Sequence, residues 1–375
     1  MKKALAFLVV GLLLLTTACS GNSSAPQSNS ESAAAPTAGS EAAPSADDFT
    51  YQKLVEYNTP VVSSGNQASF DNIAYVQGKV PTIAFMPAGT EFPYIMAVGE
   101  GIKATAAQMG ANVVTLAPQS GSDIHGQVGM LQDAISQKVD VILLNAHDDD
   151  AAGPLVKQAI EAGIVVINLN SDSTDFTAPL HGAVGYTQRA GNKAQGEALA
   201  KTFADKKLII GIIEGLPGYH NEERTGGFKE GIASHPDYEI VSSLNGSWNT
   251  DGGNTAAMDM LQAHPEINMI YAANDMEAMG ALTAMKVLGR EDIIVVANDG
   301  NTEFLEEIAA GTAYGTLNTV PYQMGQVACQ VAVDALYGKF SGGLAESPSY
   351  VTTADNVLDF LREPEKLMPK PSKEY

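Results

Sequence analysis

Residues 260–275 read MLQAHPEINMIYAAND, and residues 130–148 read MLQDAISQKVDVILLNAHD. Each segment begins with Met-Leu-Gln in a helical pattern, continues into a short apolar run and ends on polar residues. The apolar runs, 267–272 and 139–144, contain one polar residue each and then four apolar residues in a row, which is typical of strands that are buried on both faces. The same unit of helix, buried strand and polar loop therefore occurs twice in the chain.

Two further segments repeat in the same order. Residues 101–103 read GIK and residues 227–229 read GFK, and each lies in a helical pattern after the first strand of its set. One match of this kind could arise by chance, whereas several in the same order indicate two similar lobes. The chain is therefore expected to contain two related α/β units.

Short apolar runs alternate with amphipathic stretches from residue 80 onward. We expect strands at 82–86, 113–116, 139–144, 164–169, 208–213, 239–242, 267–272 and 293–297. We expect helices between them, including 97–109, 128–137, 154–162 and 190–203. This alternation predicts parallel sheets covered by helices on both faces. Such sheets bind ligands at the carboxyl ends of their strands, so two facing lobes would form a cleft between those ends.

The N-terminal segment predicts export from the cytoplasm. Lys2 and Lys3 precede the apolar run 4–15, and small residues precede Cys19. A basic start, an apolar core too short to span a bilayer and small residues before a cut are typical of a secretory signal. A cysteine at the cut resembles a bacterial lipoprotein signal, which implies that residues 1–18 are removed and Cys19 is lipidated. An ordinary signal with an incidental cysteine is the alternative.

The residues after the signal divide into two parts. Residues 19–48 are rich in Ser, Ala, Pro and Gly and carry no large apolar residue, so they cannot bury enough surface to fold. They predict a flexible tether between an extracytoplasmic domain and a membrane, which the chain would contact only through its N-terminal lipid. Residues 49–79 contain several aromatic side chains and form an N-terminal extension. The extension either packs against the first lobe or lengthens the tether.

Composition excludes some classes of partner. The net charge of −22 repels phosphate backbones, so we expect no nucleic acid partner. Lipidation of the first cysteine would leave Cys329 alone, which rules out an internal disulfide, and its apolar helical surroundings predict a small core residue. Roughly 330 residues follow the tether, enough for two domains of ordinary size.

Three motifs in the second half of the chain resemble one protein family. They are RTGGF at 224–228, ANDMEAMGA at 273–281 and VVANDG at 295–300. In this order they resemble the ribose-binding-protein-like group of periplasmic sugar-binding proteins, the solute receptors of ATP-driven importers. The resemblance extends over residues 80–354 and implies the type I periplasmic binding protein fold, an α/β architecture of two similar doubly wound parallel-sheet lobes.

The resemblance also implies how the chain is divided. Three crossings between the lobes would form a hinge, at 184–187, 318–320 and 350–352. The lobes would then be discontinuous, with an N-terminal lobe of residues 80–184 and 320–350 and a C-terminal lobe of residues 185–319 and 351–375. Closure about such a hinge traps a ligand in the cleft.

Three polar residues of these motifs are expected to bind a sugar. Arg224 presents a planar charged fork that can donate to adjacent hydroxyls, Asp299 can accept from two hydroxyls, and Asn274 can do both. Each also has a purely structural interpretation. Asp299 precedes a glycine and suits a turn, Asn274 suits a helix cap, and Arg224 suits a surface ion pair. The family resemblance favours the binding role for all three.

Aromatic residues are expected to cover the apolar face of the sugar. Trp248, the only tryptophan, lies in a polar loop after a strand, at a position that resembles the aromatic wall of the family; a core position is the alternative. In the first lobe, Tyr94 is the preferred stacking residue and Phe92 the next. Glu91 is a candidate acceptor or else a solvated loop carboxylate.

The chain departs from the ribose-binding pattern at several positions. The Asp-Arg pair of ribose binders is replaced by Asn170 and Ser171, with Asp172 just beyond. A polar residue of the first loop is replaced by Ala88, and a glutamine near the hinge by Thr319. Asn170 and Thr319 therefore join the expected site. We expect a different pentose, a hexose or a linear polyol to fit better than ribose.

The sequence predicts a monomeric, lipid-anchored receptor that delivers a small neutral sugar or polyol to the membrane permease of an ABC importer. It carries no evident nucleophile with a base, so we expect neither an enzyme nor a cofactor. The acidic run 147–150 follows a strand and points in several directions, which disfavours a metal site. A sensory receptor for a sugar-like signal is the main alternative. A transcription regulator would need a DNA-binding segment where the signal and tether lie.

Overall fold

The computed structural model describes residues 49–59, 66–118, 120–121, 123–172 and 176–367. The predicted signal peptide, Cys19 and the tether lie outside these residues. Among the residues described, no helix combines the length and the apolar character needed to cross a membrane.

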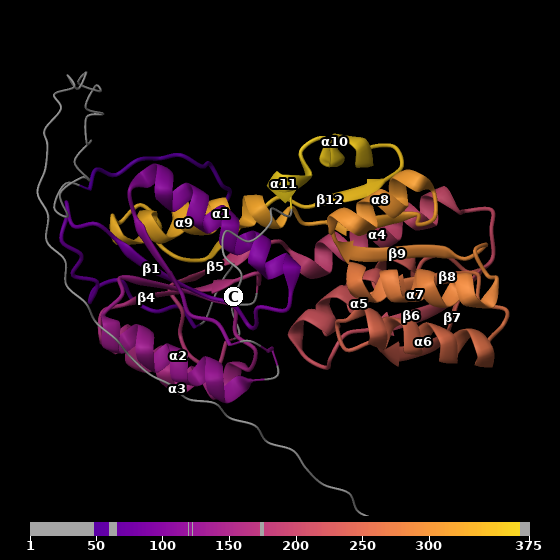
Figure 1. The fold of residues 1–375 in the computed structure, drawn as a ribbon, viewed down its shortest axis with the longest axis horizontal. Helices are drawn as coiled ribbons and strands as arrows, with labels where there is room; N and C mark the ends of the chain where they lie inside the picture. Colours follow the sequence, from indigo (N-terminus) through magenta and orange to yellow (C-terminus); the bar gives the residue numbers. More distant parts are fainter. Residues whose placement is uncertain (1–48, 60–65, 119, 122, 173–175, 368–375) are drawn as a thin grey trace, which may run out of the picture. The chain divides into compact units, whose positions relative to one another are not determined.

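The strands form two six-stranded sheets (Figure 1). The first sheet has the order β2-β1-β3-β4-β5-β11. Its strands are β1 Thr82–Met86, β2 Asn112–Thr115, β3 Val141–Leu144, β4 Val165–Leu169, β5 Gly182–Gly185 and β11 Leu344–Glu346. The second sheet has the order β7-β6-β8-β9-β10-β12. Its strands are β6 Leu208–Glu214, β7 Tyr238–Asn245, β8 Met269–Ala272, β9 Ile294–Asp299, β10 Gly315–Asn318 and β12 Tyr350–Thr353.

The two sheets share one topology. In each, the first strand in sequence pairs in parallel with the second and the third, and the later strands follow outward. Only the last pair differs, because β11 runs parallel to β5 whereas β12 runs antiparallel to β10. The repeat read from the sequence is therefore a repeat of two doubly wound units.

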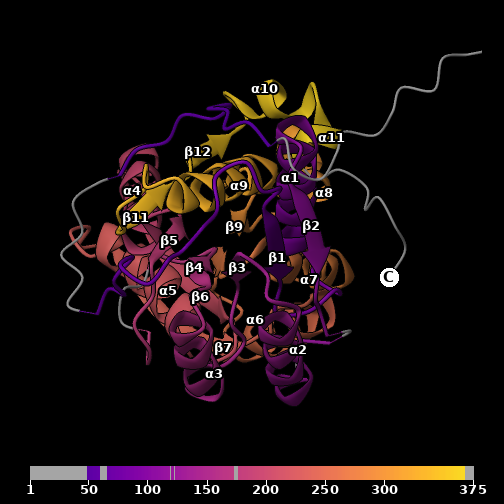
Figure 2. The ribbon, with the colours of Figure 1, turned by 90° about the vertical axis from the view of Figure 1, so that its left-hand side faces the viewer.

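Helices cover both faces of each sheet. They are α1 Pro93–Met109, α2 Ile124–Gln137, α3 Asp149–Glu161, α4 Gln188–Thr202, α5 Tyr219–Ile232, α6 Thr250–Ala263, α7 Asp275–Leu288, α8 Thr302–Ala310, α9 Pro321–Leu336, α10 Val357–Leu361 and α11 Pro364–Leu367. In the first sheet, Ile83 and Phe85 pack with α1 and α9 on one face, while Ala84 and Met86 pack with α2 and α3 on the other (Figure 2). This alternation explains the continuous apolar strands.

The second sheet is built in the same way. One face packs against α6, α7 and α8, and the other against α4 and α5. We call the first sheet with α1, α2, α3 and α9 the first lobe, and the second sheet with α4 to α8 the second lobe. The chain leaves the first sheet after β5, returns at β11 and leaves it again before β12.

The described parts of the extension 49–79 pack against the first lobe. The Asp334 carboxylate of α9 is buried and accepts hydrogen bonds from the Tyr51 and Tyr57 hydroxyls at 2.8 and 2.7 Å, and Lys53 Nζ lies 3.0 Å from it. The neighbouring Gln330 side chain accepts from two backbone amides of the extension, those of residues 54 and 55. Of the two possibilities left open by the sequence, packing against the first lobe is the one observed.

Candidate functional site

A network of buried polar side chains lies at the carboxyl ends of strands in both sheets. In the second lobe, Trp248 follows β7, Asn274 follows β8 and Asp299 ends β9, while Arg224 projects from α5. The elements explain this gathering, because parallel strands bring their carboxyl ends to one edge of a sheet.

Arg224 forms the centre of the network. Its side chain is only 5% exposed, and Nη1 donates to Asp299 Oδ1 and to the Ala273 carbonyl oxygen, each at 2.9 Å. Its Nη2 makes no hydrogen bond to any residue that the structure describes. Burial raises the pKa of Asp299, and the Arg224 guanidinium opposes this rise. The pair is therefore a buried ion pair rather than the surface pair that the sequence left open.

Asn274 is the helix cap that the sequence offered as its structural interpretation, and it also bonds the tryptophan loop. Its Oδ1 caps α7 by accepting from the Glu277 backbone amide at 2.8 Å. Its Nδ2 donates to the Trp248 carbonyl oxygen at 3.1 Å. The side chain is nearly buried and so fixes the tryptophan loop to the start of α7.

Trp248 lies half-buried in the loop between β7 and α6, outside the apolar cores. The guanidinium carbon of Arg224 is 5.4 Å from the centre of the indole ring, a cation–π distance. Gly215 makes room for the ring, because a Cβ at that position would lie 2.1 Å from it. The structure thus places an aromatic face beside the charged fork.

The first lobe contributes Tyr94 and Asn170. The Tyr94 hydroxyl is 2.7 Å from Thr319 Oγ1 and donates to Asn170 Oδ1 at 3.3 Å. Thr319 in turn donates to the Asp299 carbonyl oxygen through both its backbone amide and its hydroxyl, at 2.9 and 3.1 Å. Thr319 therefore joins the first-lobe tyrosine to the second-lobe aspartate at the point where the chain leaves β10.

Glu91 and Phe92 are not brought into this network. The Glu91 carboxylate accepts a hydrogen bond from the backbone amide of Gly121, and its side chain is exposed. Phe92 precedes α1 and packs partly buried against the core of the first lobe, beside Gly121. Both residues therefore support the loop before α1.

The sequence analysis missed two members of the network on α5 and α4. Gln188 is fully buried, and its Nε2 lies 3.0 Å from His220 Nδ1 and donates to the Asn170 carbonyl oxygen at 3.4 Å. Arg224 Nε donates to Gln188 Oε1 at 3.4 Å. Burial lowers the pKa of His220 to about 3, so its imidazole is neutral. The spacing of His220 and Arg224, one helical turn apart, was the available signal.

A contact between the lobes was also missed. The Tyr219 hydroxyl, at the start of α5, donates to Asp172 Oδ1 at 2.6 Å. The Gln188 backbone amide donates to Asp172 Oδ2 at 3.2 Å. Asp172 was noted in the sequence only as the residue after the Asn-Ser pair. It links the loop after β4 to the second lobe.

Strained backbone conformations are concentrated in this network. Among the described residues, six that are not glycine have positive φ: Lys138, Asn170, Ser247, Trp248, Asp299 and Val320. All but Lys138 belong to the network or lie next to it in sequence. Such conformations are costly and persist where the surrounding structure over-determines them, which is common at binding sites.

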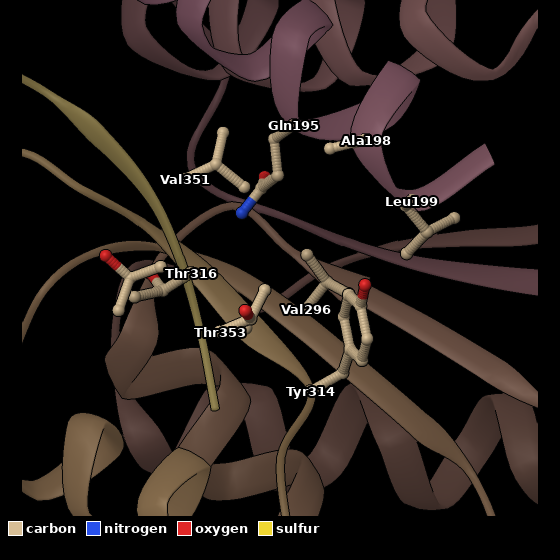
Figure 3. Close-up of a pocket in the computed structure, with 10 residues that line it drawn as sticks. Gln195, Ala198, Leu199, Val296, Tyr314, Thr316, Val351 and Thr353 are labelled. Carbon is tan, nitrogen blue, oxygen red and sulfur yellow. The ribbon is translucent and has the colours of Figure 1, made fainter. Parts of the chain in front are cut away.

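A small cavity elsewhere is unrelated to this network. It lies between α4, β9, β10 and β12 and includes Gln195 and Tyr314 in its lining (Figure 3). Its volume of about 10 Å³ holds a single water at most. Among the described residues, no three His, Cys, Asp or Glu side chains are arranged to hold a metal ion.

The sequence pattern of the family described as "Periplasmic binding protein domain" matches residues 83–340. Among curated proteins, the ribose import binding protein of Salmonella typhimurium is 28% identical over 259 residues, which is 69% of this chain and 86% of that protein. The D-ribose/D-allose-binding protein of Pseudomonas aeruginosa is 31% identical over 245 residues, 62% of this chain and 76% of that protein.

Solved structures show the same likeness. A periplasmic solute-binding protein of an ABC transporter from Actinobacillus succinogenes, with bound D-allose, superposes with a TM-score of 0.70 at 26% identity. The match covers 74% of this chain and 99% of that one. A solute-binding protein from Mycobacterium smegmatis with bound glycerol also has a TM-score of 0.70, at 25% identity, over 75% of this chain and 97% of that one. The predicted fold of two doubly wound lobes is confirmed.

Proposed function

Because the chain belongs to the periplasmic binding protein domain family, we propose that it is an extracytoplasmic receptor for a small neutral sugar or polyol, which it delivers to the membrane permease of an ABC importer. The relatives support this proposal, since one is named a ribose import binding protein and another a D-ribose/D-allose-binding protein. They are named as binding proteins, which agrees with a site built to hold a ligand unchanged.

The main support for an uncharged ligand is the buried Arg224–Asp299 pair. The two charges lie 2.9 Å apart and balance each other, so the site needs no counter-charge from its ligand. Charged donors and acceptors still form the stronger hydrogen bonds to hydroxyls, about 1.5–3 kcal/mol each. With Trp248 beside them, they offer one polar and one apolar surface, as a sugar ring requires.

Closure of the lobes would couple binding to delivery. Tyr94, Asn170 and Asp172 come from the first lobe, and Arg224 and Asp299 from the second. A ligand that contacts both sets gains its full affinity only in the closed form and so shifts the population toward closure. The closed form then presents one lobe to each half of the permease. We take the hinge to be the three predicted crossings, at 184–187, 318–320 and 350–352, with lobe boundaries as predicted.

We further propose that the receptor is a monomer tethered by a lipid on Cys19. The lipoprotein-like signal supports this part of the proposal. Metabolic labelling with an alkyne fatty acid in a bacterial host, followed by Cys19→Ser as the control, tests it. We expect label on the parent chain and none on the variant; label on both would contradict the assignment to Cys19.

Calorimetric titration tests the ligand class. The chain without its first 19 residues is titrated with pentoses, hexoses, four- to six-carbon polyols and branched amino acids. We expect saturable binding of one sugar or polyol, and weaker binding of ribose. Binding of an amino acid, with none of any sugar or polyol, would overturn the ligand class.

A further inference from the structure

A buried carboxyl group lies behind the tryptophan and was not part of the predicted site. Glu277 is the third residue of α7, and its side chain is 0% exposed. Its Oε1 accepts a hydrogen bond from the Trp248 backbone amide at 2.8 Å. Its Oε2 is buried and makes no hydrogen bond to any described residue. One oxygen of Glu277 is thus committed to the backbone of the tryptophan.

The carbonyl group of Trp248 is also bonded at the start of α7. Asn274 Nδ2 donates to the Trp248 carbonyl oxygen at 3.1 Å, and Asn274 Oδ1 accepts from the Glu277 amide at 2.8 Å. The backbone on both sides of the indole is therefore fixed to the first turn of α7. Asn274 already belongs to the predicted site, whereas Glu277 has no role assigned to it.

The tryptophan loop needs such support. Ser247 has φ 58° and Trp248 has φ 62°, a left-handed conformation that bulky residues rarely adopt. A loop of this kind keeps its shape only when contacts over-determine it. Gly246 allows one of these contacts, because a Cβ there would lie 2.6 Å from Ile213 Cγ2 and 2.8 Å from Glu277 Oε1. The close approach of the carboxyl group therefore depends on a glycine.

We propose that Glu277 is a positioning residue for the sugar site: its carboxyl group fixes the Trp248 backbone so that the indole stays beside the Arg224 guanidinium. The inference deepens the proposed function and rests on it for the nature of the ligand. The positioning itself is measurable without a ligand, because Trp248 is the only tryptophan and reports its own surroundings by fluorescence.

Two variants of Glu277 separate hydrogen bonding from packing. Glu277→Gln keeps an oxygen that can accept from the Trp248 amide, and Glu277→Met keeps the approximate shape without an acceptor. Burial raises the pKa of Glu277 to about 8, so the uncharged glutamine is a close replacement at neutral pH. Met285→Ala, in the buried face of the same helix, is the matched control for loss of packing.

The measurements are the emission maximum and acrylamide quenching of the ligand-free chain, then titration with the sugar that binds best. For Glu277→Met we expect red-shifted, more easily quenched tryptophan emission and about tenfold weaker binding. The reason is that the Trp248 backbone loses its acceptor, so the indole is no longer held in place beside the ligand. Glu277→Gln should stay within about threefold of the parent, and Met285→Ala should keep its emission and affinity while losing thermal stability.

The outcomes are distinguishable from a failure of the proposed function. Parent-like emission and affinity in Glu277→Met would overturn the positioning role. If that variant does not fold, Gly246→Ala is used, and an unchanged emission there would overturn the proposal equally. If no sugar or polyol binds the parent chain, the proposed ligand fails, while a red shift in Glu277→Met would still support the positioning of Trp248.

Discussion

The two lobes share a topology but contribute differently to the site. The second lobe supplies a charged, internally hydrogen-bonded set, namely Arg224, Asp299 and the capped start of α7. The first lobe supplies the neutral Tyr94 and Asn170, and the carboxylate of its Asp172 is engaged by Tyr219. We therefore expect most of the affinity for the ligand to come from contacts with the second lobe. The first lobe should mainly supply the contacts that form when the lobes close.

The largest expected effect is the loss of Arg224. Arg224→Met removes the charged donors to the ligand hydroxyls, and such hydrogen bonds contribute about 1.5–3 kcal/mol each, so the loss of two should weaken binding more than a hundredfold. It also leaves Asp299 buried without its partner, which should lower the free energy of unfolding by about 3–5 kcal/mol. Calorimetry measures the loss, with thermal unfolding recorded in parallel. Arg290→Met is the control, because Arg290 also bonds a carboxylate and backbone carbonyls of the second lobe but lies outside the network. Parent-like affinity in Arg224→Met would contradict the binding role of the charged side chains of the second lobe.

The next largest effect is expected on the folding stability of the first lobe, with ligand affinity unchanged. Replacing both Tyr51 and Tyr57 by Phe removes two hydroxyl donors from buried Asp334, which should lower the free energy of unfolding by about 2–4 kcal/mol. Urea denaturation measures it. Tyr350→Phe, at an exposed tyrosine, is the control. Unchanged stability would show that the extension contributes no folding energy to the first lobe.

A smaller effect is expected at the first-lobe side of the site. Tyr94→Phe removes the hydroxyl that joins Thr319 and Asn170, and a neutral hydrogen bond contributes about 0.5–1.5 kcal/mol, so affinity should fall about three- to tenfold. Tyr322→Phe, at the start of α9, is the matched control. A loss at Tyr94 as large as that at Arg224 would reverse the comparison between the lobes.

The last effect is a pH dependence of stability that arises in the first lobe and should leave the site unchanged. His181 is fully buried beside Phe70 of the extension, and burial lowers its pKa to about 4 from an unfolded value of 6.5. Between these values the unfolded chain binds more protons, so stability should fall as the pH falls from 6.5 to 4. His181→Gln should flatten this slope, whereas His125→Gln at an exposed position should not. Equal slopes for parent and His181→Gln would contradict the assignment.

Most of the fold could be predicted from the sequence, because strands buried on both faces consist mainly of apolar residues. All eight predicted runs contain strands. The strands β5, β10, β11 and β12 escaped the pattern, since GAVG, GTLN, LAE and YVTT carry few large apolar side chains. These short strands border the places where the chain passes between the sheets, and only the family resemblance pointed to those places.

The site could be predicted only in part. Arg224, Asn274 and Asp299 stand in recognisable motifs, and the structure brings them together with Trp248. The Asp172–Tyr219 contact joins residues 47 apart in sequence, and no local pattern marks such a pair. The left-handed backbone of Trp248 could not be predicted either, because its amide bonds Glu277, which lies 29 residues away in sequence.

The most direct test is a crystal structure with the best-binding sugar or polyol. We predict that Arg224 and Asp299 hydrogen-bond the ligand hydroxyls, that the Trp248 ring lies against the apolar face of the ligand, and that the second lobe makes most of the polar contacts. A ligand that contacts neither Arg224 nor Asp299, or that is held mainly by the first lobe, would contradict it.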